Sequence, residues 1–251
     1  MAEILAAGVD VHHDLADVLD YFASVRPKVV VISGAGSEFL TAPPDRPGHA
    51  AAVRHQFGDR DRAWKLLRGI IRCHHQLAEM DPIVVASVNG DAIGFGASIV
   101  LGADFVVAAE DAVIADHHAS LDELEGMNRQ FTLIPGDGGA ALAPGVLPTG
   151  WANGYAYLGR PLDPAALAAA GLIYAAVPRN EVVSATDELV ARLLRRSRYT
   201  LAWTKRVMNR RRVQELNLTM DSSVAYEWLS ALFADDPNDG DVLGITASVR
   251  P

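Results

Sequence analysis

Val88-Asn-Gly-Asp-Ala-Ile-Gly-Phe-Gly-Ala97 decides the fold, because it joins an apolar run to a short segment of small residues. The apolar run 83–88 predicts a buried strand, and Gly94-Phe95-Gly96 predicts a tight turn that opens a helix. Backbone N–H groups at such a turn can approach a ligand oxygen closely, and the helix dipole favours negative charge there. A second interpretation is that the glycines only permit tight packing of the helix against the sheet.

The segments on either side of this stretch alternate between helical and strand patterns. Upstream, apolar residues at helical spacing begin near residue 11, a strand is predicted at 28–33 and a second helix at 61–80. Downstream, residues 105–108 and 112–115 read as strands. Helices that alternate with continuous apolar strands are typical of a parallel sheet covered by helices, so the sequence predicts an α/β fold.

The second half of the chain changes character. Residues 117–150 are irregular and contain Ile134-Pro-Gly-Asp-Gly-Gly139, whereas 151–234 is almost wholly helical. A short strand is predicted at 172–177, and the last helices at 181–196, 198–212 and 215–233. We therefore expect a core over residues 1–150 and a helical C-terminal region over residues 151–251.

Composition excludes several classes of protein. With 50% hydrophobic and 21% charged residues among 251, the chain can bury a sizeable core and is not intrinsically disordered. Its apolar runs are far shorter than the roughly 20 residues that span a bilayer. A net charge of −9 argues against a nucleic-acid partner. Cys73 is the single cysteine, which excludes an intrachain disulfide and a thiolate zinc cage. Without a signal-peptide pattern at its start, we expect a cytoplasmic protein with no membrane partner.

Two segments resemble the crotonase (enoyl-CoA hydratase/isomerase) superfamily. Residues 88–97, followed by Asp104, match its Val-Asn-Gly, glycine turn and helix. Val29-Val-Val-Ile-Ser-Gly-Ala-Gly-Ser-Glu-Phe39 is similar to the strand and turn before its first oxyanion-hole residue. Order and spacing agree from about residue 11 to residue 233. The resemblance implies a crotonase-like ββα spiral core and a helical C-terminal region that assembles the chain into a homotrimer or homohexamer.

The resemblance also implies an oxyanion hole. Its donors would be the backbone N–H groups of Thr41 and Phe95, which converge on one oxygen and stabilise an enolate. Removing one donor of this kind costs about 3 kcal/mol.

This sequence departs from the hydratases of the superfamily at their two catalytic glutamates. The first glutamate position holds Ser98, and the second aligns with Asn128 when no insertion is allowed. Neither side chain can act as a carboxylate base, so hydration of an enoyl-CoA by the usual route is not expected.

The run Ile134-Pro-Gly-Asp-Gly138 resembles a different branch, the β-diketone hydrolases typified by 6-oxocamphor hydrolase, which cleave a C–C bond without coenzyme A. This resemblance implies that Asp137 pairs with a catalytic histidine. That histidine is His118 when an insertion is placed after residue 119, with His117 and Asn128 as alternatives. The resemblance further implies that His12 binds substrate and that Glu227 contributes a carboxylate from the last helix. It implies no cofactor and no metal.

The chemistry suits those side chains. Hydrolysis of a β-diketone needs water to attack one carbonyl, after which C–C cleavage expels an enolate. An imidazole is a natural base near neutral pH, and a buried carboxylate fixes its tautomer. On this hypothesis Asp137 and His118 activate water, His12 donates a hydrogen bond to the second carbonyl, and Glu227 orients His12 or His118.

Each candidate also has a structural interpretation. Asp137 precedes a predicted helix start and could cap it. His117 and His118 could be solvated loop residues, and Glu227 could face solvent. His12 lies in a first helical turn, where a cation gains nothing from the helix dipole, and this favours a functional reason for it.

Two further groups are predicted to have structural roles. His74 and His75 lie in mid-helix and are expected to be packing or surface residues. The basic residues from Lys205 to Arg212 are expected to form a solvated helix face with acidic partners nearby, with a subunit contact or a CoA phosphate site as the alternatives.

Three functions remain open from the sequence. The leading hypothesis is a retro-Claisen hydrolase of a β-diketone-like substrate. The second is an enzyme that acts on a CoA thioester, such as a hydratase or isomerase, with Asp137 as its lone acid/base. The third is a catalytically inert binding protein of the same fold, which Ser98 and Asn128 would suit.

Overall fold

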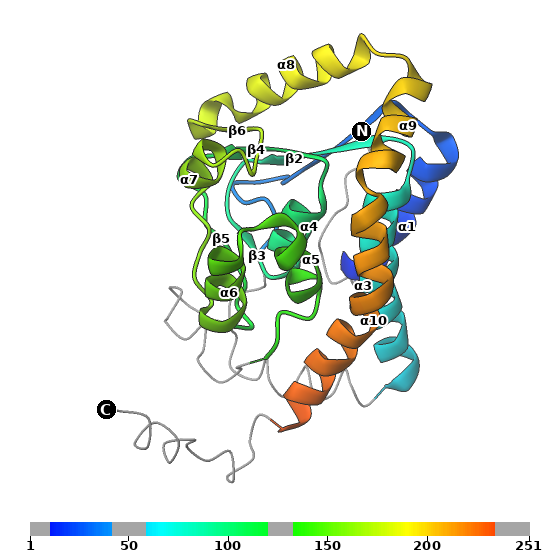
Figure 1. The fold of residues 1–251 in the computed structure, drawn as a ribbon, viewed down its shortest axis with the longest axis vertical. Helices are drawn as coiled ribbons and strands as arrows, with labels where there is room; N and C mark the ends of the chain where they lie inside the picture. The colour runs from blue at the N-terminus through cyan, green and yellow to red at the C-terminus, as the bar shows by residue number, and fades with distance from the viewer. Residues whose placement is uncertain (1–10, 42–58, 120–132, 234–251) are drawn as a thin grey trace.

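The computed structural model describes residues 11–41, 59–119 and 133–233, which form parallel sheets covered by helices (Figure 1). Asn128, one alternative for the catalytic histidine position, lies outside these ranges. The α/β class and the crotonase-like core predicted from the sequence are confirmed by the comparisons given below.

The main sheet contains four parallel strands in the order β1-β2-β4-β6. Their bounds are Val29–Ser33 for β1, Ile83–Val88 for β2, Phe105–Ala109 for β4 and Ala175–Val177 for β6. All six residues of β2 are buried, as expected for a strand with neighbours on both sides and helices over both faces. In the pairing of β1 with β2, Val29 lies opposite Ile83 and Ser33 opposite Ser87.

A second, two-stranded parallel sheet positions the site. It pairs β3 (Ala92–Ile93) with β5 (Ile114–Ala115), and helix α4 (Phe95–Gly102) follows β3 after Gly94. Leu40 bridges to Ala92, and its carbonyl accepts from the N–H of Ile93 at 2.9 Å. These strands therefore bring the 34–41 segment, the start of α4 and the end of β5 to one place.

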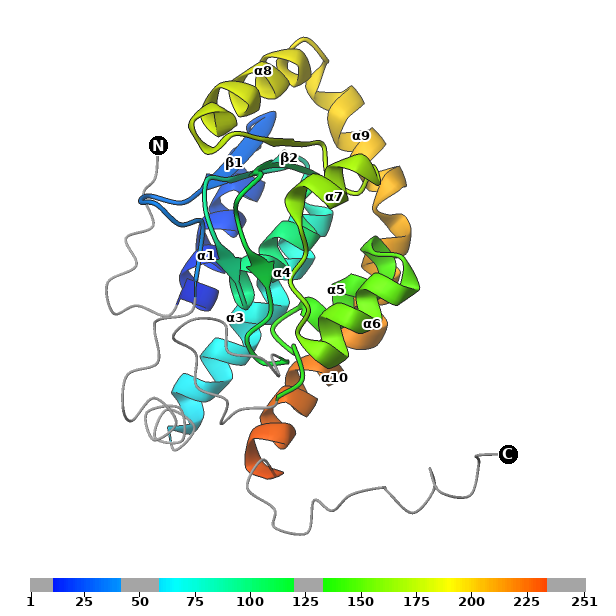
Figure 2. The same ribbon diagram turned by 90° about the vertical axis from the view of Figure 1, so that its left-hand side faces the viewer.

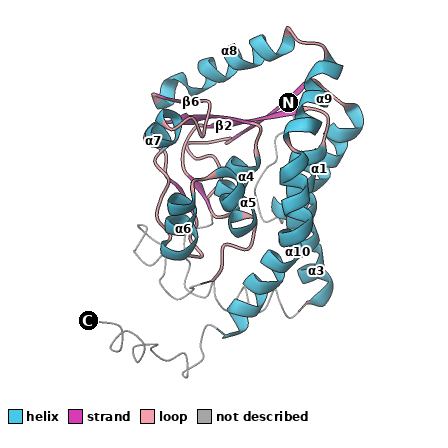
Figure 3. Cartoon of the chain, in the orientation of Figure 1, coloured by secondary structure: helices cyan, strands magenta, loops and turns pink. Residues whose placement is uncertain are grey.

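Helices cover the sheet and form most of the C-terminal half (Figure 3). Those not yet given are α1 (Val11–Val25), α3 (Arg60–Glu79), α5 (Gly139–Val146), α6 (Thr149–Leu158), α7 (Pro164–Ala169), the 3₁₀ turn η1 (Arg179–Glu181), α8 (Val182–Leu194), α9 (Arg198–Met208) and α10 (Arg210–Phe233). Helix α8 lies over the main sheet, and α10 packs against α3 and α5. None of the helices in the described ranges has the length and apolar character that crossing a membrane requires.

Helices α1 and α3 lie side by side, and a glycine sets how closely they approach (Figure 2). A Cβ on Gly69 would lie 2.7 Å from the backbone nitrogen of His13 and 2.8 Å from the carbonyl carbon of His12. Any larger residue at position 69 would therefore push the first turn of α1, which carries His12, away from the core.

The break between the last two helices differs from the sequence prediction. The sequence predicts a final helix from 215, but α10 begins at Arg210 directly after Asn209. The amide of Asn209 donates to the Ala78 carbonyl at 3.1 Å and to Asp104 Oδ1 at 3.0 Å. This tertiary anchor ends α9, and helical periodicity contains no signal for it.

The prediction of a solvated basic face is wrong for Lys205. Its side chain is buried, with Nζ 2.7 Å from Asp104 Oδ2 and 2.9 Å from the Pro82 carbonyl. Arg206, in contrast, is 64% exposed and forms a 2.8 Å ion pair with Asp81, as expected for a solvated face with an acidic partner. These cations attach α9 to the ends of the buried strands.

Candidate active site

Titratable side chains from separate parts of the chain meet where β5 ends. Asp116, His117 and His118 follow β5 directly, Asp137 lies just before α5, and Glu227 comes from α10. The structure therefore brings together residues that are more than one hundred positions apart in the chain. Of the predicted catalytic residues, His118, Asp137 and Glu227 belong to this cluster.

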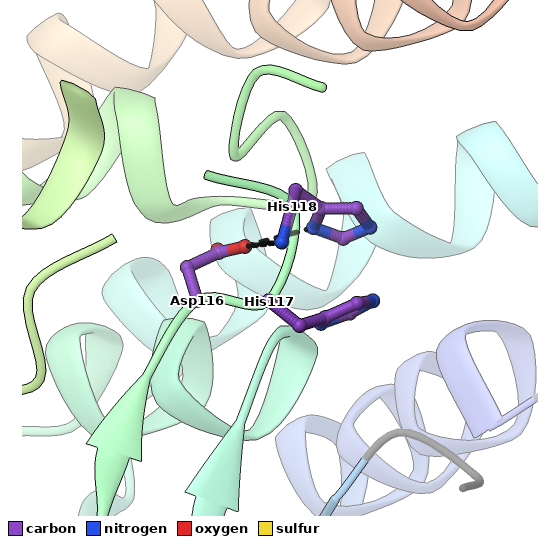
Figure 4. Close-up of side chains that lie close together, drawn as sticks. All are labelled: Asp116, His117 and His118. Carbon is purple, nitrogen blue, oxygen red and sulfur yellow. Dashed lines mark hydrogen bonds and ion pairs between the residues drawn. The ribbon is translucent and has the colours of Figure 1, made fainter. Parts of the chain in front are cut away.

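The carboxylate that contacts the His118 ring is Asp116. Its Oδ1 lies 2.9 Å from His118 Nδ1 and also accepts from the His118 backbone N–H at 2.9 Å (Figure 4). The sequence pairs His118 with Asp137 instead. The structure corrects that direct pairing, because a turn of three residues is enough to fold the ring back onto the adjacent carboxylate. Asp137 still acts on His118 through its charge.

Asp116 is fully buried and makes His118 a cation. Burial by itself lowers the pKa of His118, but Asp116, followed by Glu227 and Asp137, outweighs burial and raises it to about 10. Burial would raise the pKa of Asp116, but the charge of His118 and its hydrogen bonds hold it below the ordinary value. At neutral pH the pair is therefore an imidazolium and a carboxylate, and His118 is a proton donor.

Asp137 is held by two side chains that the sequence did not assign to the site. Its Oδ1 accepts from Ser98 Oγ at 3.0 Å, and its backbone carbonyl lies 2.7 Å from His74 Nε2. The alternative that Asp137 caps α5 is wrong, since the cap residue is Gly138 and no side chain caps that helix end. Ser98, the residue that the resemblance aligns with the first glutamate of the hydratases, thus hydrogen-bonds the Asp137 carboxylate.

The two remaining carboxyl groups are both harder to ionise than usual. Burial, followed by the charge of Asp116, raises the pKa of Asp137 to about 6, although His118 opposes this. Burial raises the pKa of Glu227 to about 8; the charge of His118 opposes this, and the charges of Asp137 and Asp116 add to it. Because the pKa of Asp137 lies just below neutrality, its carboxylate can take up a proton during a reaction at neutral pH.

Glu227 approaches the opposite edge of the His118 ring. Its Oε1 lies 3.6 Å from His118 Nε2, and its side chain is 21% exposed. Gly136 makes this approach possible, because a Cβ there would lie 2.3 Å from the Glu227 Cβ. Of the two histidines that Glu227 was predicted to orient, the structure places it beside His118.

The predicted oxyanion donors lie on adjacent backbone segments. Phe95 begins α4 after Gly94, whose φ of +64° is a conformation that favours glycine. The Leu40–Thr41 segment passes so close to α4 that a Cβ on Gly96 would lie 2.1 Å from the Leu40 carbonyl oxygen. Thr41 is further fixed by a 2.6 Å hydrogen bond from its hydroxyl to Glu38.

His12 lies beside this oxyanion region. Its ring centroid is 4.3 Å from that of Phe95, and its charge lowers the pKa of Asp137. The first turn of α1 therefore holds the His12 ring against Phe95 at the start of α4.

Four buried side chains of the site are absent from the sequence prediction, namely Asp116, Ser98, His74 and Tyr155. His74, expected to be a packing or surface residue, stacks edge-on against Phe95 with centroids 5.7 Å apart. Burial lowers its pKa to about 4, so it is neutral and Nε2 donates to the Asp137 carbonyl. Tyr155 of α6 places its hydroxyl 3.5 Å from Asp116 Oδ2. The adjacency Asp116-His117-His118 was the one available signal for Asp116, and no local pattern reveals Tyr155.

The same adjacency creates a group that could hold a metal ion. One ligand atom each from Asp116, His117 and His118 lies within 4.8 Å of the others. However, the two imidazoles stack with centroids 3.9 Å apart and an angle of 37° between their planes (Figure 4). The in-plane lone pairs of stacked rings run side by side, so this arrangement favours the hydrogen-bonded pair of Asp116 and His118 over a shared ion.

A substitution at Gly138, between Asp137 and α5, tests how closely the chain packs around the acid–base cluster. Gly138 has a φ of +133°, and a Cβ there would lie 2.3 Å from His74 Nε2 and 2.9 Å from the Ser98 Cβ. We expect Gly138→Ala to lower the free energy of unfolding by about 3 kcal/mol, since backbone strain and overpacking add. Urea unfolding measures this. Gly150→Ala is the control, because its Cβ would have no neighbour within 4 Å; an equal loss there would contradict the interpretation.

Comparison with known proteins agrees with this fold. A model of the enoyl-CoA hydratase/isomerase family matches residues 8–236. Carnitinyl-CoA dehydratase of Salmonella paratyphi A is 27% identical over 216 residues, which cover 85% of this chain and 76% of that protein.

Solved structures are similar over most of their length. An enoyl-CoA hydratase/isomerase from Mycobacterium paratuberculosis has a TM-score of 0.76 at 25% identity, covering 88% of this chain and 83% of its own. A β-diketone hydrolase from the cyanobacterium Anabaena sp. PCC 7120 has a TM-score of 0.73 at 18% identity, with coverages of 88% and 82%, and so shares the fold. Because the family model spans nearly the whole chain, this protein belongs to the enoyl-CoA hydratase/isomerase family, within the crotonase superfamily.

Proposed function

We propose that this protein hydrolyses a carbon–carbon bond in a β-diketone-like substrate, a retro-Claisen reaction. The observation that carries the proposal is a carboxylate that can accept a proton beside an imidazolium that can donate one, both in the same buried cluster. Asp137 has a pKa near 6, whereas His118 is held as a cation by Asp116. Environments that separate two pKa values in this way define an acid and a base. His118 is therefore the acid in this proposal and not the base that the sequence predicted, because a ring that stays protonated cannot accept a proton.

In the proposed reaction Asp137 removes a proton from water as the water oxygen attacks one carbonyl carbon. Collapse of the tetrahedral intermediate breaks the C–C bond, and the bonding electrons become an enolate. The oxygen of the second carbonyl becomes the enolate oxygen, which the N–H groups of Thr41 and Phe95 hold and to which His12 also donates. His118 protonates the enolate carbon and regains its proton from Asp137. Diketone and water thus become one keto acid, with no cofactor or metal.

The assigned protonation states predict a bell-shaped pH profile for kcat. Turnover should fall below a pH of about 6 as Asp137 becomes protonated, and again toward a pH of about 10 as His118 loses its proton. Steady-state rates measured from about pH 5 to about pH 11 cover both limbs. A profile that rises through pH 7 and stays flat to pH 10 would instead indicate a neutral imidazole base.

Product analysis tests the reaction class. Cyclic β-diketones and enoyl-CoA thioesters should be offered separately, with binding followed by calorimetry and products by mass spectrometry. The proposal expects a diketone to gain one water and yield a carboxylate, with no affinity for CoA. Binding of a CoA thioester without diketone cleavage would overturn it.

The second candidate is a dehydratase or isomerase that acts on a CoA thioester. The 27% identity to carnitinyl-CoA dehydratase favours it. Asp137 would then be the single acid/base, because Ser98 stands at the first glutamate position. Under this hypothesis the Thr41 and Phe95 N–H groups would hold a thioester enolate, and the product would retain CoA.

Assembly as a homotrimer or homohexamer is also part of the proposal. The C-terminal helices expose apolar side chains, among them Trp203 at 64%, Val207 at 76% and Leu218 at 80% exposed. Apolar surface of this kind is typical of an interface with another chain. Light scattering that gave the mass of a single chain at micromolar concentration would exclude such an assembly.

A further inference from the structure

A cavity of about 400 Å³ lies apart from the acid–base cluster. It is bounded by the C-terminal end of α4, by β4, by α7 and by Arg212 of α10. Its wall is mostly aliphatic and includes Leu101, Val146, Leu167 and Leu172. Neither Asp137 nor His118 lines it. Its volume falls within the range of about 300–1,000 Å³ that is typical of pockets for small molecules.

Two charged side chains line this cavity, and one of them is already neutralised. Asp104 accepts from the backbone N–H of Val84 at 2.8 Å and from Asn209 at 3.0 Å, and Lys205 Nζ lies 2.7 Å from it. The carboxylate of Asp104 is thus occupied by protein donors, and its charge is balanced by Lys205. It is therefore not the group that a ligand would address.

Arg212 supplies the remaining charge. One of its guanidinium nitrogens donates to the Gly102 carbonyl at 3.1 Å, and this bond holds the group at the cavity wall. A guanidinium carries five N–H donors, so most of its donor capacity remains for a planar anion. Burial lowers the pKa of Arg212, with Asp104 and Glu215 opposing, so its charge is partly desolvated and gains from a counter-ion.

We infer that this cavity binds a small amphipathic monocarboxylate, with its apolar body against the aliphatic wall and its carboxylate on Arg212. This site is independent of the proposed reaction, because it shares none of the acid–base residues. The apolar wall supplies affinity through buried area, and Arg212 selects the charged head.

Calorimetry with sodium decanoate tests the inference. We expect saturable binding of one molecule per chain to the wild-type protein. Arg212→Gln should weaken it about tenfold or more, because it removes the cation and leaves the wall intact. Arg210→Gln is the matched control, since Arg210 is an exposed arginine of the same helix turn and does not line the cavity. Its affinity should be unchanged.

Further variants separate binding in this cavity from binding at the acid–base cluster or on the protein surface. Leu172→Trp fills the cavity and should abolish binding with Arg212 in place, while Asp137→Asn should leave decanoate affinity unchanged. Decanol, which lacks the charge, should bind at least about tenfold more weakly than decanoate. Absence of saturable binding, equal affinity in Arg212→Gln, or loss of binding in Asp137→Asn would each overturn the inference. The inference would also be overturned if self-association of the wild-type protein excluded decanoate from the cavity. Light scattering at rising protein concentration would detect such self-association.

Discussion

Asp137→Asn should lower kcat by about 10²-fold to 10⁴-fold while leaving KM within a few fold. The variant removes the proposed base, and general-base catalysis contributes a factor of this size. Asparagine keeps the shape of the side chain and can still accept from Ser98 Oγ, which lies 3.0 Å from Asp137 Oδ1. Substrate binding should therefore persist. Steady-state kinetics on the cyclic diketone that the product screen selects measures both constants.

The same variant should not lose stability. The pKa of Asp137 is raised to about 6 from an ordinary value of 3.8, so its ionisation costs the folded state free energy as pH rises through that interval. Asparagine carries no such cost, so Asp137→Asn should be at least as stable as the wild type at neutral pH. Asp221→Asn, on an exposed position of α10, is the control for the chemical change alone.

For the kinetic prediction, a turnover of Asp137→Asn within twofold of the wild type would remove Asp137 from the mechanism.

Asp116→Asn should move the alkaline limb of the pH profile to lower pH. Burial lowers the pKa of His118, and the charge of Asp116 is the largest effect that opposes burial. Without that charge the pKa of His118 falls, so the ring becomes neutral at lower pH and the acid is lost over more of the working range. We expect kcat at a pH of about 8 to fall roughly 10²-fold, as for loss of a general acid. A limb that stayed near pH 10 would show that Asp116 does not hold the proton on His118.

Stability should change in the same variant with a defined dependence on pH. The pKa of His118 is about 10 in the folded protein and 6.5 in the unfolded chain. The stability that the protonated ring contributes is therefore complete below pH 6.5 and is lost as pH rises toward 10. Breaking a buried ion pair costs about 3–5 kcal/mol, so urea unfolding at a pH near 6 should show a loss of this size, shrinking at higher pH. Asp111→Asn breaks an exposed pair with Arg179 and should cost less than about 1 kcal/mol.

Much of the fold follows from local patterns that need no tertiary information. The run 83–88 became the central strand β2, and Gly94-Phe95-Gly96 became the turn into α4, because apolar continuity and glycine act on the chain directly. The predicted short strand at 172–177 contains β6, and the helix start at Gly138 became α5. The boundary at Asn209 was missed, because a hydrogen bond to Asp104 more than one hundred residues away fixes it.

The candidate site also has a part that the sequence predicts and a part that depends on tertiary contacts. The family resemblance, carried by short motifs, nominated Asp137, His118, Glu227, His12, Thr41 and Phe95, and left open whether His118, His117 or Asn128 pairs with Asp137. A resemblance can nominate these residues because motifs are read from residue types and their order along the chain, which need no knowledge of the fold.

Only the tertiary structure decided the partners and the protonation states. It placed Asp116 at 2.9 Å from His118, set Ser98 and His74 against Asp137, and brought Glu227 from the last helix to the far side of the ring. A pKa depends on burial and on charges a few ångströms away, which are summed over segments distant in sequence. For that reason the sequence could nominate His118, Asp137 and Glu227, whereas their partners Asp116, Ser98 and His74 and the choice of acid and base follow from the fold.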